Sequence, residues 1–127
     1  MSGVACPCGS GHALAACCGR FHRGEPAPDA EALMRSRYSA FVLRLESYLL
    51  ATWHPDSRPA TLELDVPPRS QWLGLAIKSY TPLDEHHATV EFVARYKING
   101  RAFKLHEVSR FEQVGGRWLY LDGDMLG

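Results

Sequence analysis

The sequence has no excess of charge of one sign and no long apolar run. Its 127 residues contain 14 Lys plus Arg and 14 Asp plus Glu, so no overall field attracts a polyanion such as nucleic acid. No stretch approaches the roughly 18 apolar residues that cross a bilayer. Residues 1–16 also lack the basic start and apolar stretch of a secretory signal. We therefore expect a cytoplasmic protein without a membrane partner, and nucleic acid is not its default partner.

Beyond residue 18 the chain has no cysteine, although four cysteines are clustered near its start. They follow the spacing C-x-C-x8-C-C between Cys6 and Cys18. In a reducing compartment such a cluster is more often a metal or redox site than a set of structural disulfides. Four thiolates suit tetrahedral zinc with every coordination position filled by protein. The alternatives are four free thiols, a strained Cys17–Cys18 redox pair and an iron–sulfur cluster.

The composition predicts one folded domain with a small appendage. The chain is 46% hydrophobic and 22% charged, close to the globular average, which argues against a disordered or fibrous protein. Residues 1–28 are rich in Gly, Ala, Cys and Pro without a helical or strand period, so they predict an irregular unit. Pro26 and Pro28 mark its end. The larger domain then covers residues 29–127.

From Asp29 onwards the apolar residues follow helical spacing as far as Trp53. Asp29 is a suitable N-cap. Because this pattern is long for a globular helix, we expect a break near residues 43–46 into two helices. Pro55 ends the second one, since a residue before proline avoids the helical conformation. The proline-rich residues 55–70 predict a surface loop with room for one brief edge strand over 61–66.

The second half of the chain is rich in β-branched and aromatic residues. It predicts four antiparallel strands over 72–80, 87–98, 102–114 and 117–122. Asn99-Gly100 and Gly115-Gly116 lie where two-residue hairpin turns are expected. The chain is therefore expected to continue as a meander of strands after the helices.

Counting outward from these turns assigns each side chain to one face of the sheet. Phe92 then opposes Glu107, and Ser109 opposes Asp122. One face is mainly apolar and aromatic: Val90, Phe92, Ala94, Tyr96, Phe103, Leu105, Glu107, Ser109, Phe111, Trp118, Tyr120 and Asp122. The reverse face is mostly charged. The helices must cover the aromatic face, so we expect an α+β fold with helices packed on a curved antiparallel sheet.

The aromatic face carries polar groups that predict a pocket. Glu107 and Asp122 lie among aromatic rings, where burial favours the uncharged carboxyl and suits it to acid–base catalysis. Tyr38 and Trp53 of the helical segment are further pocket candidates. The histidines His54, His86, His87 and His106 lie in no catalytic motif, so none of these four is assigned as the base.

A structural role for the two carboxylates is the simpler interpretation. Glu107 and Asp122 would hold Arg35 or Arg37 in a buried ion pair between helix and sheet. A basic stripe on the reverse face, balanced by Glu91, is ordinary for an exposed sheet and gives only weak support to nucleic-acid binding: Arg95, Lys97, Lys104 and Arg110.

The cysteines are embedded in a recognisable signature. The chain reads Cys6-Pro7-Cys8-Gly9-Ser10-Gly11, then Cys17-Cys18-Gly19. This resembles the SEC-C motif, a small zinc module found at the C-terminus of the SecA motor. The resemblance implies Zn²⁺ held by four ligands: Cys6, Cys8, Cys17 and Cys18. His12 or His22 is an alternative to Cys18.

Six further segments share the pattern of a known family: Leu33–Val42, Thr52–Pro55, Trp72–Leu75, Phe92–Tyr96, Ser109–Phe111 and Trp118–Gly123. They resemble the YchJ family of uncharacterised small bacterial proteins. The resemblance implies an N-terminal SEC-C motif followed by a cone-shaped domain similar to nuclear transport factor 2. Many members carry a second SEC-C motif at the C-terminus. This sequence ends at Gly127 without one, so we do not assign it a role that needs two.

These features favour a zinc-binding interaction protein. The cysteine module would bind a protein partner, and the cone would serve as a scaffold or hold a small ligand. One alternative is an enzyme of isomerase or dehydratase type that uses Glu107 or Asp122. A second alternative is a nucleic-acid-associated zinc protein. The sequence does not decide between catalysis and binding, and it does not indicate an oligomeric state.

Overall fold

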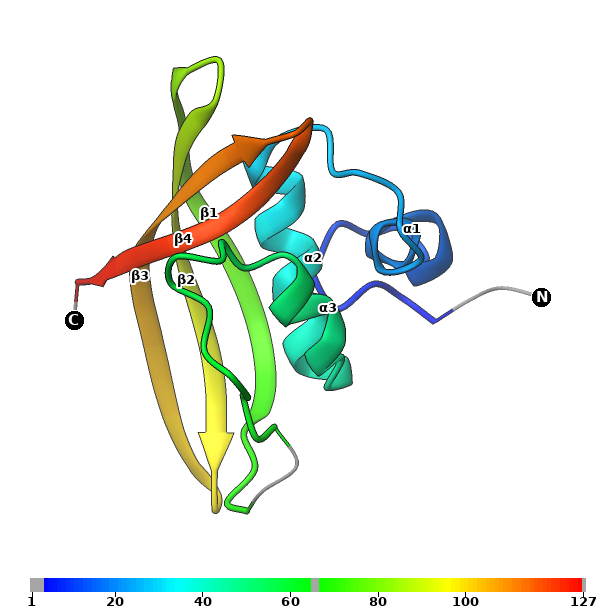
Figure 1. Ribbon diagram of the computed structural model, residues 1–127. Helices are drawn as coiled ribbons and strands as arrows, with labels where there is room; N and C mark the ends of the chain where they lie inside the picture. The colour runs from blue at the N-terminus through cyan, green and yellow to red at the C-terminus, as the bar shows by residue number, and fades with distance from the viewer. Residues whose placement is uncertain (1–3, 65–66, 127) are drawn as a thin grey trace.

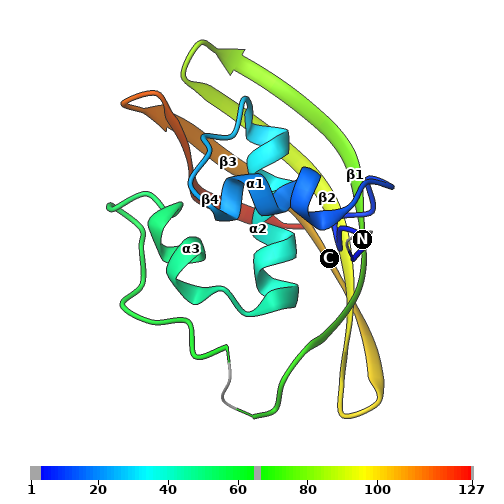
Figure 2. The same ribbon diagram turned by 90° about the vertical axis from the view of Figure 1, so that its right-hand side faces the viewer.

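A computed structural model describes residues 4–64 and 67–126 (Figure 1). The sheet forms one layer, α2 lies against it, α3 lies beside α2, and α1 lies on the far side of α2 (Figures 1 and 2). The predicted α+β class is confirmed. In chain order the elements are a 3₁₀ turn Leu14–Ala16, α1 Cys18–His22, α2 Ala30–Leu43, α3 Glu46–Ala51, β1 Gln71–Asp84, β2 His87–Ile98, β3 Arg101–Val114 and β4 Arg117–Met125.

Local features of the chain set the start and end of α2 and the break before α3. The Asp29 carboxylate accepts a hydrogen bond of 2.8 Å from the Ala32 backbone N–H, which confirms the predicted N-cap of α2. Arg44 has a left-handed φ of 59° and ends α2, and α3 begins at Glu46. The predicted break is therefore confirmed. No helix in the described ranges has the length and apolar character needed to cross a membrane.

The cysteine-rich segment is more ordered than its composition predicts. In place of a wholly irregular unit it contains the 3₁₀ turn Leu14–Ala16 and the helix α1. Gly19 permits this arrangement, because a Cβ at that position would lie 2.7 Å from the Leu14 carbonyl oxygen. Helical elements of three and five residues are too short to produce a periodic pattern in the sequence.

The four strands form one antiparallel sheet in the order β1-β2-β3-β4. Both hairpin turns have positive φ at each central residue, 53° and 79° at Asn99-Gly100 and 58° and 80° at Gly115-Gly116. This is the geometry expected of tight two-residue turns. Between β2 and β3 the register is the predicted one, with Phe92 opposite Glu107.

The register between β3 and β4 follows the prediction from Val114 to Phe111 and then departs from it. A bulge lies between Arg110 and Phe111, so Ser109 faces Gly123 and Arg110 faces Asp122. The expected pairing of Ser109 with Asp122 is wrong, because one extra residue reverses the alternation of side chains along the rest of the strand. Asp122 therefore lies on the outer, charged face.

The core fills the space between α2 and the inner face of the sheet. The buried cluster contains the predicted aromatic face together with one side of α2: Ala30, Leu33, Met34, Tyr38, Ala88, Val90, Phe92, Ala94, Phe111 and Trp118. Residues 55–64 and 67–70 form a loop without a strand. The last part of the suggested edge strand, at Val66, lies outside the described residues.

Candidate functional site

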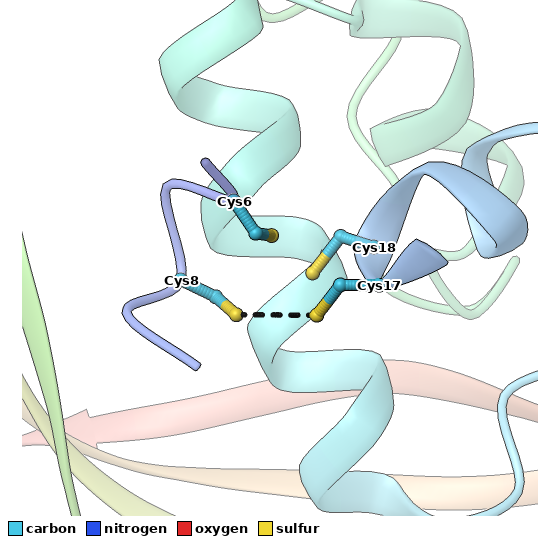
Figure 3. Close-up of side chains that lie close together, drawn as sticks. All are labelled: Cys6, Cys8, Cys17 and Cys18. Carbon is cyan, nitrogen blue, oxygen red and sulfur yellow. Dashed lines mark hydrogen bonds between the residues drawn. The ribbon is translucent and has the colours of Figure 1, made fainter. Parts of the chain in front are cut away.

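The four cysteines converge at the start of α1. Cys6 and Cys8 lie on the loop that precedes the 3₁₀ turn, Cys17 lies just before α1 and Cys18 is its first residue (Figure 3). The four Sγ atoms all lie within 4.8 Å of one another. Three of the four side chains are buried, and Cys17 is partly exposed. All four are free thiols, so no disulfide competes with metal binding.

The spacing of the sulfurs fits a tetrahedral metal. In a tetrahedron with zinc–sulfur bonds of about 2.3 Å, neighbouring sulfurs lie about 3.8 Å apart. Cys8 Sγ and Cys17 Sγ lie 3.7 Å apart (Figure 3). With all four ligands supplied by protein, no coordination position stays open for a substrate. The donor set is therefore that of a structural site.

The cluster is electrostatically prepared for a cation. Hydrogen bonding from Cys18 lowers the pKa of Cys8 to about 4, against the opposing effect of burial. The same interaction raises the pKa of Cys18, and burial raises that of Cys17. One thiolate thus forms readily, whereas further thiolates beside it are opposed by burial and like charge. A divalent cation would offset that repulsion and permit the full tetrathiolate.

Helix α2 supports the cysteine cluster from behind. Arg35 Nη1 donates to the Cys8 carbonyl oxygen at 3.1 Å, and Ser39 Oγ lies 3.5 Å from Cys6 Sγ. The Ser10 hydroxyl lies 3.1 Å from Cys17 Sγ. Hydroxyl groups near thiolates disperse their charge and orient them. The module is therefore docked on the larger domain at its ligands.

The alternative histidine ligands lie elsewhere. His12 is exposed, and His22 Nε2 lies 2.9 Å from the Ser36 carbonyl oxygen with its ring edge against Tyr48. Neither belongs to the group of candidate ligands among the described residues. The structure thus brings together the four cysteines that the motif resemblance names.

A second candidate site is a cavity of about 300 Å³ between α2 and the sheet. Half of its lining residues are aromatic: Tyr38, Phe41 and Trp53 from the helical half of the chain, and Trp72, Phe92 and Tyr120 from the sheet. A parallel bridge between Trp53 and Tyr120 fixes the segment after α3 to β4. Of the predicted pocket residues, Glu107, Tyr38 and Trp53 line this cavity.

Two charged side chains lie in the cavity wall. Arg37 is 3% exposed and Glu107 is 6% exposed. Arg37 Nη1 donates to the Leu49 carbonyl oxygen and to Thr52 Oγ1, and burial lowers the pKa of Arg37 to about 10. Arg37 therefore remains charged at neutral pH.

The Glu107 carboxylate has its own donors. Glu107 Oε2 accepts hydrogen bonds from Ser109 Oγ at 2.7 Å and from the Tyr120 hydroxyl at 3.1 Å. Burial is the first cause that raises the pKa of Tyr120, and the nearby Glu107 charge adds to it. Tyr120 thus stays protonated and can keep donating its hydrogen bond.

Several predicted pocket contacts are wrong. Asp122 forms an ion pair of 2.6 Å with Arg110 on the outer face, because the bulge turns it away from the cavity. Arg35 pairs with Glu31 at 3.2 Å, so it is not the arginine held between helix and sheet. Among the described contacts of Arg37 none is an ion pair with Glu107, although both line the cavity.

Comparison with known proteins gives the family. A family model described as "YchJ, middle NTF2-like domain" matches residues 29–123, and the SEC-C motif matches residues 5–20. The chain belongs to the YchJ-like family. A UPF0225 protein of Bordetella parapertussis is 57% identical over 98% of this chain and 95% of its own. A UPF0225 protein of Cupriavidus metallidurans is 58% identical over 94% of this chain and 88% of its own.

Two solved structures share the whole arrangement. The solution structure of a SEC-C motif containing protein from Rhodopseudomonas palustris is 34% identical, with a TM-score of 0.84 over 100% of both chains. The crystal structure of a SEC-C motif containing protein from Psychrobacter arcticus is 29% identical, with a TM-score of 0.77 over 96% of this chain and 82% of that one. The family resemblance seen in the sequence is thereby confirmed.

In this YchJ-like chain, sequence reasoning missed the residues that support the cysteine cluster and the cavity. Arg35 and Ser39 face the cysteines, whereas Arg37 and Tyr38 face the cavity. The spacing of four residues between Arg35 and Ser39 places them on one side of α2 and was the available signal. Gly123 gave no signal, although a Cβ there would overlap the Glu107 carboxylate.

Proposed function

We propose that this YchJ-like protein is a cytoplasmic zinc protein whose SEC-C module binds a protein partner. The observation that carries the proposal is the group of four cysteine Sγ atoms within 4.8 Å of one another. Thiolates favour zinc over hard cations such as magnesium, and four protein ligands are typical of structural zinc. The metal would hold residues 4–24 in one shape.

The outward side of the module supports the partner role. Its basic residues His12, Arg20 and Arg23 are exposed. Arg20 pairs with Glu25 at 3.4 Å, and Arg23 donates to the Ala15 carbonyl oxygen at 3.1 Å. The basic groups are thus held on a small scaffold while the thiols face α2. Such a surface suits an acidic segment of another protein.

Metal analysis of reduced, purified protein tests the first half of this proposal. We expect about one zinc per chain, as a closed four-thiolate site requires, and loss of that zinc in Cys6→Ser. Protein that contains no stoichiometric zinc when purified under reducing conditions would overturn the metal assignment.

A pull-down tests the partner role, with zinc content measured in each variant because Arg20 also donates to the Cys17 carbonyl oxygen. The double variant Arg20→Glu, Arg23→Glu reverses charge on the module, and Arg101→Glu makes the same change at the distant β2–β3 turn. We expect the same bound protein with wild type and Arg101→Glu, and its loss in the double variant. Equal capture of the bound protein by wild type and both variants would show that the module does not mediate the interaction.

The cavity favours a second candidate function, the binding of a small molecule by the cone. With Asp122 outside, Glu107 is the one acidic side chain among the described residues that line the cavity. Its carboxylate already accepts two hydrogen bonds, so we propose binding in preference to acid–base catalysis. Nucleic-acid binding loses one member of the basic stripe on the outer face, where Asp122 and Asp124 neutralise Arg110.

A further inference from the structure

The cavity has an unusual distribution of charge for an apolar pocket. Its aromatic wall includes one buried cation, Arg37, and one buried anion, Glu107. No described hydrogen bond or ion pair joins the two. Buried opposite charges normally pair directly, because each is costly to bury alone. Tyr120 spans the gap between them, because its ring centre lies 4.7 Å from the Arg37 guanidinium carbon and its hydroxyl donates to Glu107.

Unused hydrogen-bonding capacity lies on both sides of this gap. Glu107 accepts its two hydrogen bonds at Oε2, which leaves Oε1 without a partner among the described residues. Arg37 donates only from Nη1. The Trp53 indole N–H is buried without any partner, and the Arg37 guanidinium carbon lies 5.0 Å from the centre of the Trp53 ring. One side therefore offers donors, and the other side offers an acceptor.

We infer that the cone binds a small, uncharged aromatic molecule that carries an amide or lactam group. The amide carbonyl accepts from Arg37, and the amide N–H donates to Glu107 Oε1. The ring packs against the aromatic wall, with Tyr38 and Trp72 among its contacts. A cavity of about 300 Å³ is at the small end of ligand sites, so it suits one or two rings.

The charges of the wall also select against ions. The guanidinium and the carboxylate cancel, so the cavity has no net charge to compensate a charged ligand. A ligand carboxylate would meet Glu107, and a ligand ammonium would meet Arg37. Leaving such a charge partly unpaired away from water is unfavourable. This inference rests on the second candidate function and is independent of the zinc module.

Three matched probes test the inference on the full-length protein: benzamide, benzoate and benzylammonium. Binding is followed by two-dimensional NMR shifts of residues lining the cavity. We expect a dissociation constant for benzamide at least about ten-fold below those of both ions. Equal or tighter binding of benzoate or benzylammonium would overturn the ligand class while leaving a binding cone. No cavity shifts with any probe would overturn the binding function of the cone itself.

A conservative variant adds a test that a merely structural role would not pass. In Glu107→Gln the amide oxygen still accepts from Ser109 and Tyr120, and its NH₂ replaces the free acceptor with a donor. We expect benzamide to weaken about ten-fold and benzoate to bind more tightly than to wild type. Glu112→Gln is the control, because Glu112 lies outside the cavity beside His54. Unchanged probe preference in Glu107→Gln, or the same change in both variants, would overturn the inference.

Discussion

The cysteine module and the cone are stabilised in different ways. Within the described part of residues 1–28, the buried apolar side chains are three cysteines and Phe21. The cone buries a contiguous cluster between α2 and four strands. A segment with so small a core needs a metal or disulfides to hold its shape, whereas the cone can depend on apolar burial. The two regions share one chain but have separate sources of order.

Helix α2 is where the two regions meet. Its Arg35 and Ser39 contact the module, and its Arg37 and Tyr38 line the cavity. Arg35, Ser36 and Ser39 make its described hydrogen bonds to the module, and the apolar side of the helix packs in the core. Disturbing one region should therefore affect the other only through this helix.

Metal removal should produce the largest effect and separate the two regions. Chelation, or Cys8→Ser, would remove the proposed zinc, and metal binding contributes about 10 kcal/mol or more to the folding of small zinc modules. We expect amides of residues 4–24 to lose hydrogen-exchange protection while those of β2 and β3 keep theirs. Segment-resolved hydrogen exchange by mass spectrometry measures this. Equal loss of protection in both regions would show that they are one cooperative unit.

Truncating a core side chain should instead destabilise the cone and leave the cysteine module unaffected. Phe111 is 1% exposed in the cone, so Phe111→Ala should lower the free energy of unfolding by about 3–5 kcal/mol through lost burial and a cavity. Denaturant unfolding measures the loss, and we expect the zinc content of the folded protein to be unchanged. Loss of zinc from the folded variant would contradict the independence of the two regions.

A substitution beside the cavity should have an intermediate effect confined to the cone. In Gly123→Ala the new methyl group would overlap the Glu107 carboxylate, which must move away from Ser109 and Tyr120. We expect a loss of about 1–3 kcal/mol, typical of overpacking. Thermal unfolding measures it, with Gly74→Ala as the control, since a Cβ at Gly74 meets no atom within 4 Å. Equal stability of the two variants would contradict the packing described for Glu107.

The smallest effect is expected at the contact between the regions. Arg35→Ala removes the hydrogen bond to the Cys8 carbonyl oxygen and the partly exposed pair with Glu31, for a loss of about 1 kcal/mol. We expect hydrogen exchange to rise in residues 4–24 and not in the sheet. Arg95→Ala on the exposed outer face is the control. A larger change in the sheet than in the module would show that α2 depends on Arg35 for its position in the core.

Much of this architecture follows from local features of the sequence. Asp29 as N-cap, the break after Leu43 and the two positive-φ turns each depend on residues close together in the chain, and each is confirmed. The β2–β3 register follows from the Asn99-Gly100 turn by simple counting. Counting from the Gly115-Gly116 turn fails after Phe111, because nothing in the local sequence marks the bulge between Phe111 and Arg110.

The sequence by itself determined the α+β fold, the inner face of the sheet up to the bulge and the four clustered thiols. These depend on periodicity, turn chemistry and spacing, which act over short stretches of chain. The tertiary structure alone decided that Asp122 pairs outside with Arg110, that Arg35 supports the cysteines and that Arg37 shares a cavity with Glu107. Such contacts join residues distant in sequence, and one bulge or helix rotation exchanges their partners.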